Sequence, residues 1–142
     1  MSAIENAKGW YESICEMVAT LKSVQAANGK YGGSNKEDYA RDRIHESVLS
    51  VEVRSGWSAP GDKYAKPKEY SILLTTGGPA LRLIGDLDEY GQPETARLEY
   101  QDWGTPWTEY NPGHHEDAFK PEDYDAYDST LLAFASCFYF GE

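Results

Sequence analysis

Four segments in the middle of the chain alternate apolar with polar residues, and the last three follow one another after only a few residues. Their apolar positions are Leu49, Val51 and Val53, then Tyr70, Ile72 and Leu74, then Leu81, Leu83 and Leu87, and finally Ala96, Leu98 and Tyr100. A period of two is typical of strands that bury one face of a sheet. Connections this short cannot cross over a sheet, so we expect antiparallel neighbours. The pattern predicts a meander of about four strands, with residues 107–110 as a short edge strand.

The N-terminal segment has the periodicity of a long amphipathic helix. Ser2 and Glu5 form a capping-box pattern at its start, and Asn28-Gly29 is a typical stop. Between them the apolar residues recur at spacings of three and four, namely Ile4, Ala7, Tyr11, Ile14, Val18 and Leu21. This pattern predicts a helix of about seven turns. Residues 36–47 fit either a short helix capped by Asn35 or an extended run into the next strand.

A second helical spacing marks the C-terminal segment, after Pro121 as a first helical residue. The recurring apolar positions are Tyr124, Tyr127, Leu131, Phe134 and Phe138. They predict a C-terminal helix. The apolar run 131–140 also fits a buried central strand, because periodicity does not separate the two there.

These patterns together predict a single α+β domain over residues 1–142. Its elements are an N-terminal helix, an antiparallel meander of about four strands, and a C-terminal helix packed on the sheet. The length of 142 residues and the hydrophobic content of 40% suit one domain with a sizeable core. The residues expected to be buried on one sheet face are Leu49, Val51, Ile72, Leu74, Leu81, Leu83 and Leu98, with Ile14, Val18 and Leu21 packed over them.

The two cysteines, Cys15 and Cys137, lie in apolar stretches and match no zinc or redox spacing. We interpret them as buried thiols in a reducing compartment, with a disulfide between the terminal segments as the alternative. The N-terminus has no basic and apolar leader pattern, and the longest apolar run, residues 131–140, is half the length of a membrane span. The sequence therefore predicts a cytoplasmic protein.

Charge is divided unevenly along the chain. The whole sequence has 24 acidic and 13 basic residues, a formal net charge of −11. Residues 1–85 contain 10 acidic and 11 basic residues, whereas residues 86–142 contain 14 acidic residues and only Arg97 and Lys120 as basic ones. Negative charge at this density repels nucleic acids and anionic membranes and attracts basic proteins.

The acidic residues of the C-terminal half are interleaved with aromatic ones, which supply rigid contact area at protein interfaces. The expected partner-binding residues are Asp102, Trp103, Trp107, Glu109, Tyr110, Glu122, Asp123, Tyr124, Asp125 and Asp128. The hypothesis is a non-enzymatic binding or inhibitor protein whose acidic surface imitates a nucleic acid toward a basic, nucleic-acid-binding protein. The alternative interpretation of the same charge is an acidic surface that only keeps the protein soluble.

Other candidate sites are less specific. His114 and His115 stand side by side without a third ligand at a standard spacing, so we expect an exposed loop and no metal. Asp86 and Asp88 begin like a calcium loop, but Arg97 occupies its twelfth position, and we expect a hairpin turn. His45 is interpreted as a structural or surface residue.

Neither a nucleophile motif nor a phosphate loop is present in the sequence, and no cofactor is expected. An alternative function is a small ligand-binding or hydrolytic domain that uses carboxylates near Trp103 and Trp107. A mimic would need a flat or convex acidic surface, whereas an enzyme would need a deep pocket with convergent polar groups.

The run from Arg82 to Gly91, continued from Tyr100 to Trp107, resembles small accessory proteins of phages and conjugative elements. Anti-CRISPR and antirestriction proteins are found among them, and many are short, acidic and without enzymatic motifs. The resemblance is one of type and assigns no residue a role. It implies a DNA mimic that inhibits a host effector.

Overall fold

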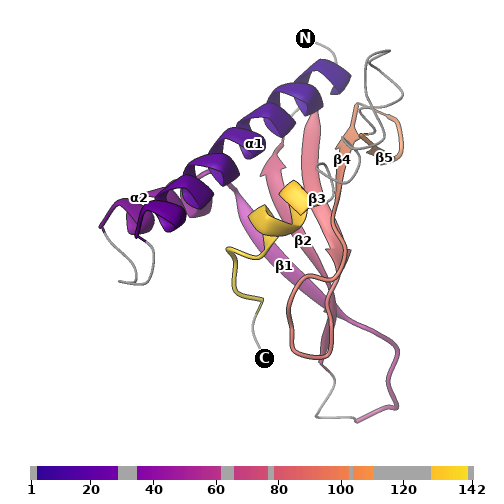
Figure 1. Cartoon of the computed structure of the whole chain (residues 1–142). Helices are drawn as coiled ribbons and strands as arrows, with labels where there is room; N and C mark the ends of the chain where they lie inside the picture. Colours follow the sequence, from indigo (N-terminus) through magenta and orange to yellow (C-terminus); the bar gives the residue numbers. More distant parts are fainter. Residues whose placement is uncertain are drawn as a thin grey trace.

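The computed structural model describes residues 3–28, 35–61, 66–76, 79–102, 104–110 and 129–140. Two helices come first, α1 (Ala3–Asn28) and α2 (Asn35–Glu46). Five antiparallel strands follow and lie side by side in chain order (Figure 1), namely β1 (Ser50–Ser55), β2 (Pro67–Thr75), β3 (Ala80–Asp86), β4 (Arg97–Gln101) and β5 (Thr108–Glu109). Residues 129–135 form a short C-terminal helix. The predicted α+β fold with an antiparallel meander is confirmed.

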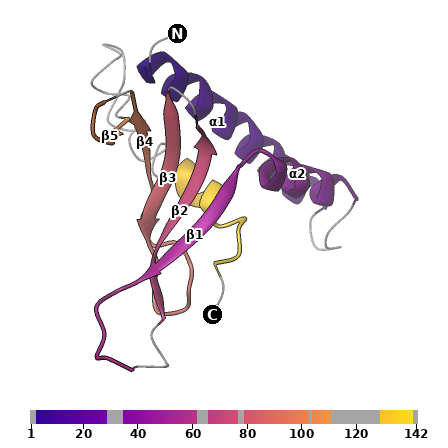
Figure 2. The same ribbon diagram turned by 180° about the vertical axis from the view of Figure 1, so that it is seen from behind.

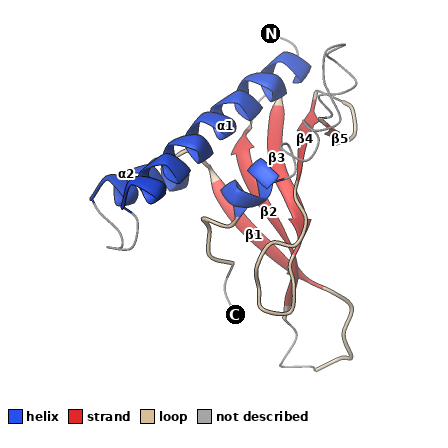
Figure 3. Ribbon diagram, in the orientation of Figure 1, coloured by secondary structure: helices blue, strands red, loops and turns tan. Residues whose placement is uncertain are grey.

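The helices lie on one side of the sheet. The C-terminal helix is in front of the strands in Figure 3, and the view from behind in Figure 2 shows the strands in front of it. Strand side chains that point to this side form one core with α1, α2 and the C-terminal helix, as Ile72, Leu83 and Ile44 illustrate. The opposite side of the sheet carries no helix among the described residues.

The burial predicted for the central strands is confirmed. Each of the predicted positions on β2, β3 and β4 is at most 2% exposed, namely Ile72, Leu74, Leu81, Leu83 and Leu98. Ile14, Val18 and Leu21 of α1 are buried with them. These residues alternate on the strands and recur at three and four on the helix, so both patterns place apolar side chains in one shared layer.

The burial predicted for β1 is wrong. Leu49 is 59% exposed, Val51 37% and Val53 44%. Val51 and Val53 lie opposite the buried Ile72 and Tyr70, so they point to the helix side of the sheet. They are nevertheless exposed because β1 is an edge strand of the sheet and the core formed by the described helices is centred on β2, β3 and β4.

Two ambiguous segments are now assigned. Residues 36–47 are helical up to Glu46, with Glu37 and Asp38 in the first turn of α2, where acidic side chains favour helix formation. The C-terminal run is helical through residue 135 and then leaves the helix. Beyond it, His45 Nε2 lies 2.6 Å from the Cys137 carbonyl oxygen, and the Phe140 ring packs 4.8 Å from the Tyr70 ring. His45 was expected to be a structural or surface residue, and it is exposed with this contact to the chain beyond the C-terminal helix.

Cys15 and Cys137 are both free thiols and both half-buried, so the alternative of a disulfide between them is wrong. Burial raises the pKa of each thiol.

None of the helices in the described ranges combines the length and apolar character that crossing a membrane requires. The helix start at Ser2 and the turn at Gly77-Gly78 lie outside the described residues.

Gly85 provides a test of the sheet packing. It lies opposite Tyr70, whose hydroxyl donates a 2.6 Å hydrogen bond to the Thr95 carbonyl. A Cβ atom at position 85 would overlap that carbonyl and lie 2.8 Å from the Tyr70 hydroxyl oxygen. Because the overlap involves backbone, Gly85→Ala is expected to lower the free energy of unfolding by about 1–3 kcal/mol in urea denaturation.

Gly9→Ala is the matched control. A Cβ atom at this position in α1 would meet no atom within 4 Å. Alanine in a helix interior is expected to raise the free energy of unfolding by roughly 0.5–1 kcal/mol. Equal effects of the two substitutions would contradict the packing described around Gly85.

Candidate functional site

The side of the sheet without a described helix, called the open face below, is built by the positions that alternate with the buried ones. The cross-strand register aligns its side chains in three rows. The rows are Arg54, Glu69 and Asp86; then Glu52, Ser71, Ile84 and Arg97; then Leu73, Arg82, Glu99 and Glu109. Antiparallel pairing brings directly opposite residues within contact distance, so each row is a line of neighbours.

Glu99 organises the third row. It is 8% exposed and is the one charged side chain among the described residues that is buried. Its Oε1 accepts hydrogen bonds from Arg82 Nε at 2.8 Å and Nη2 at 2.7 Å, and its Oε2 accepts one from Arg97 Nε at 3.0 Å. Two arginines are therefore used to hold one carboxylate. This pairing also offsets the repulsion between Glu99 and Glu109, which lies opposite on β5.

Trp107 fixes the position of Arg82. The Arg82 guanidinium carbon lies 4.1 Å from the centre of a Trp107 ring, within cation–π distance. Trp107 is half-buried, in the segment that leads into β5. One ring face of Trp107 is therefore occupied by Arg82, and the guanidinium is held between an aromatic ring and the Glu99 carboxylate.

The ion pairs of the open face leave an excess of carboxylates. Arg54 pairs with Glu69, and Arg82 and Arg97 both pair with Glu99. Within the described ranges, no basic side chain forms an ion pair with Glu52, Asp86 or Glu109. The open face thus presents negative charge at both edges of the sheet and at the end of β3, around the half-buried Leu73, Ile84 and Trp107.

Two concavities include residues of the open face in their lining. One of about 370 Å³ lies on the open face and is lined by Arg54, Arg82, Arg97 and the carboxylates between them. A wider one of about 910 Å³ lies beneath the β1–β2 connection, and its Trp57 side chain is fully exposed at 106%. Because the Trp57 side chain is fully exposed, it does not form the wall of an enclosed ligand-binding pocket.

The structure places the sequence-predicted residues in different surroundings. Asp102 and Glu109 are exposed near the end of the sheet where Trp107 packs on Arg82. The Asp102 carbonyl accepts a 3.2 Å hydrogen bond from the Thr105 N–H, which closes the turn after β4. Trp103, Glu122, Asp123, Tyr124, Asp125 and Asp128 lie outside the described residues.

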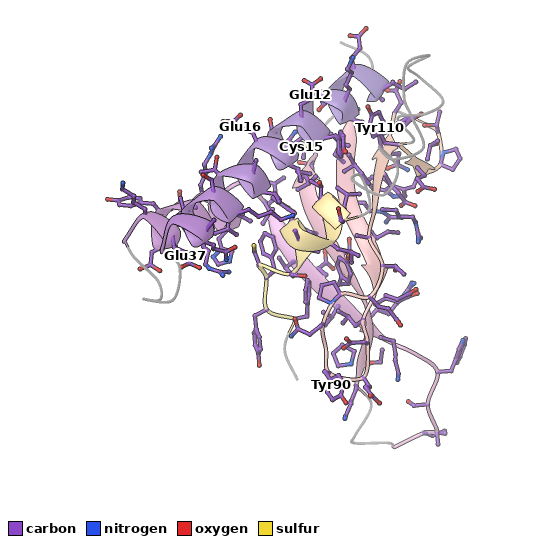
Figure 4. All side chains as sticks on the ribbon, viewed as in Figure 1. Glu12, Cys15, Glu16, Glu37, Tyr90 and Tyr110 are labelled. Atoms are coloured by element: carbon purple, nitrogen blue, oxygen red, sulfur yellow. The ribbon has the colours of Figure 1, made fainter. Side chains whose placement is uncertain are left out.

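Tyr110 is not a surface residue. It is 1% exposed, its ring lies 6.0 Å from the Tyr11 ring of α1, and its N–H donates to the Leu98 carbonyl at 2.7 Å. Figure 4 shows it between α1 and the end of the sheet. The prediction that it contacts a partner is corrected, because the residue after β5 turns inward and closes this end of the core.

The acidic turn between β3 and β4 is a hairpin turn, as expected. Asp88 Oδ1 accepts hydrogen bonds from the N–H groups of Tyr90 at 2.8 Å and Gln92 at 2.9 Å, and Gly91 has a φ of 78°. One oxygen of the Asp88 carboxylate is thus used by the backbone.

In the part of the chain that the structure describes, no three His, Cys, Asp or Glu side chains gather as metal ligands. His114 and His115 lie outside that part.

The Arg82–Glu99–Arg97 cluster was not predicted from the sequence. The alternation did place Arg82 on the polar side of its strand and Arg97 and Glu99 on the polar side of theirs. The missing information was the register, which puts Arg82 directly opposite Glu99. A one-residue slip would have separated these side chains onto opposite faces of the sheet.

Comparison with known proteins adds no relative. No protein-family model, no curated protein and no solved structure matches the chain.

The burial of Glu99 leads to a prediction about stability. Glu99→Gln removes the charge that two arginines share and keeps the size of the side chain. It is expected to lower the free energy of unfolding by about 1–3 kcal/mol, because hydrogen bonds to charged groups are lost and the arginines stay partly buried. Urea denaturation measures the change.

The same substitution at an exposed pair is the control. Glu69 pairs with Arg54, whose side chain is 78% exposed. Glu69→Gln is expected to cost less than about 1 kcal/mol, because water and salt screen the pair. If Glu99→Gln proved no more costly than Glu69→Gln, the cluster would have no special role in the fold.

Proposed function

We propose that this protein is a non-enzymatic binding protein that presents its open face to a basic protein surface. The observation that carries the proposal is the charge arrangement on that face. Its three arginines are each held by a carboxylate of the same chain, whereas Glu52, Asp86 and Glu109 have no ion pair among the described residues. Lysine and arginine side chains of a partner would supply the missing counter-charges.

The apolar part of the open face supports protein rather than ion binding. Leu73, Ile84 and Trp107 lie half-buried within a surrounding of charged side chains. Protein interfaces commonly combine an apolar or aromatic centre with a polar, charged rim. Arg82 is fixed by Trp107 and Glu99, so this part of the surface would lose little side-chain freedom on binding.

The charge of the C-terminal half extends the argument to the class of partner. Residues 86–142 contain 14 acidic residues against two basic ones, and Asp102 and Glu109 stand exposed at one end of the sheet. A nucleic-acid-binding groove has a complementary excess of lysine and arginine. The proposed action is therefore inhibition, in which the acidic surface occupies such a groove in place of the nucleic acid.

The alternative of a hydrolytic or small-ligand site beside Trp107 has less support. Glu99 is the carboxylate that reaches Arg82, and both of its oxygens accept hydrogen bonds from arginines. A general base needs a carboxylate free to take a proton from its substrate. One ring face of Trp107 is also covered by Arg82.

The test removes the three carboxylates outside ion pairs. The variant Glu52→Gln/Asp86→Asn/Glu109→Gln should fold normally, because all three side chains are exposed. Proteins captured by the immobilised wild type from a lysate of the source cells are identified and purified. Their affinity for the variant is expected to fall by about tenfold or more at 50 mM salt, as several attractive charge pairs are lost. The difference should shrink at about 300 mM salt, where the charges are screened.

A variant with the same change in net charge is the control. Glu12→Gln/Asp42→Asn/Glu46→Gln neutralises three exposed acids on α1 and α2 (Glu12 is labelled in Figure 4). This variant should bind like the wild type, because its changes lie on the helices and leave the open face intact. Equal losses in both variants would mean that net charge alone matters and would overturn the proposal.

A second assay tests the inhibition itself. The captured partner is loaded with fluorescent duplex DNA or RNA, and the wild type is titrated in. Displacement of the nucleic acid by the wild type and by the helix variant, but not by the open-face variant, is expected. A partner that holds the protein and the nucleic acid at once would contradict mimicry while leaving a binding function on the open face. The acidic residues Glu122, Asp123 and Asp125 stay a sequence prediction for the same assay, neutralised together.

A further inference from the structure

Exposed apolar side chains concentrate along one edge of the sheet. Seven large apolar side chains are exposed among the described residues, and four of them belong to β1 and its immediate flanks. They are Leu49 at 59%, Val51 at 37%, Val53 at 44% and Trp57 at 106%. Single exposed apolar residues are ordinary on protein surfaces, but a row at alternate positions of one strand is typical of a contact surface.

The backbone of β1 is also available for pairing. β1 is the first strand in the sheet order, and within the described residues it pairs with β2 alone. It has six residues, contains neither proline nor lysine, and runs in regular register from Ser50 to Arg54, with one irregularity between Arg54 and Ser55. The opposite edge strand, β5, has only two residues. Natural proteins commonly protect edge strands by shortness, proline or lysine, and β1 lacks these three, while its irregularity lies after the charged residues Glu52 and Arg54.

We propose that β1 pairs antiparallel with β1 of a second copy of this chain, joining the two sheets across a two-fold axis at Val53. The charges of the strand are complementary to themselves in this register. Centring the pair on Val53 puts Glu52 opposite Arg54 of the second copy, and Arg54 opposite Glu52 of the second copy. Two opposite-charge cross-strand pairs result, each a favourable contact.

The neighbouring registers are less favourable. Registers must keep each side chain on its own face, so the two strands can shift only in steps that preserve the alternation. Centring on residue 52 would put Glu52 opposite Glu52, and centring on residue 54 would put Arg54 opposite Arg54. Centring on Val51 would leave Glu52 opposite Ser50. The register at Val53 is the one among these that pairs opposite charges.

The apolar row is buried by the same arrangement. Val53 meets Val53 of the second copy on the helix side of the sheet, where it continues the layer formed by Tyr70 and Ile72. At the end of the paired strands, just outside β1, Leu49 lies opposite Trp57 of the second copy. The pairing therefore brings Val53 against its counterpart and Leu49 beside Trp57 of the second copy, and three of the four exposed apolar side chains of this edge gain an apolar neighbour.

The existing contact of Arg54 is compatible with the pairing. Arg54 is bound to Glu69 of its own chain, and its side chain is 78% exposed. A guanidinium group has five N–H donors, so it can contact Glu69 and a second carboxylate together. The dimer would align two open faces in one continuous surface, on which Glu52 pairs with Arg54 of the second copy and Asp86 and Glu109 are the carboxylates left outside ion pairs among the described residues. The inference depends on β1 alone and does not need the proposed binding function.

Charge-swap variants test the register directly. Sedimentation equilibrium of the wild type from about 1 to 100 µM should show a monomer–dimer equilibrium. Glu52→Arg puts arginine opposite Arg54 twice and should weaken the dimer by about a hundredfold. Arg54→Glu puts glutamate opposite Glu52 and should do the same. Circular dichroism checks that each variant keeps its fold.

Two rescue experiments decide the outcome. The double variant Glu52→Arg/Arg54→Glu restores opposite charges on both sides of Val53 and should dimerise like the wild type. In a register centred on residue 52, the same variant would put two arginines opposite each other and would not dimerise better than the single variants. An equimolar mixture of the two single variants should also form heterodimers. A wild type that stays monomeric over the whole range, a Glu52→Arg variant that still dimerises normally, or a double variant that fails to recover would overturn the inference.

Discussion

The structure depends on burying one face of a single antiparallel sheet. α1, α2 and the C-terminal helix share one core with the inward side chains of β2, β3 and β4, and Ile72, Leu83 and Leu98 at its centre are fully buried. Hydrophobic burial of this kind is the dominant favourable contribution to folding. Because the described helices lie on one side, every other residue of each strand faces the opposite side, and the fold itself creates the open face (Figure 2).

Glu99 shows how the open face accommodates its charge. A carboxylate this buried is unfavourable unless it is paired and hydrogen-bonded. Arg82 and Arg97 meet that requirement, and Trp107 holds Arg82 in place. The arginines that offset Glu99 are then not paired with Glu52, Asp86 and Glu109. The stability of the sheet and the negative character of its surface therefore have the same origin, which links the fold to the proposed binding function.

The two edge strands of the sheet, β1 and β5, differ in length and in the exposure of their surroundings, and this difference underlies the proposed dimer. β5 is two residues long and is followed at once by Tyr110, which turns into the core. β1 is longer, and its inward side chains Val51 and Val53 are 37% and 44% exposed. An edge strand with exposed apolar side chains is a site of association in general. The alternation of Glu52 and Arg54 around Val53 makes association with an identical strand specific in register.

The sequence by itself determined the long helix α1 and the order of the central antiparallel strands, because helical and strand periodicities are local properties of the chain. It left residues 36–47 and 131–140 open between helix and strand, and the structure assigned them. It also determined which side of β2, β3 and β4 is buried, and that acidic residues gather after Gly85. Only the tertiary structure decided the exposure of Leu49 and Val51, since this depends on where the helices end above the sheet. It likewise decided the pairing of Glu99 and the burial of Tyr110, because cross-strand register and packing against α1 join residues distant in the chain.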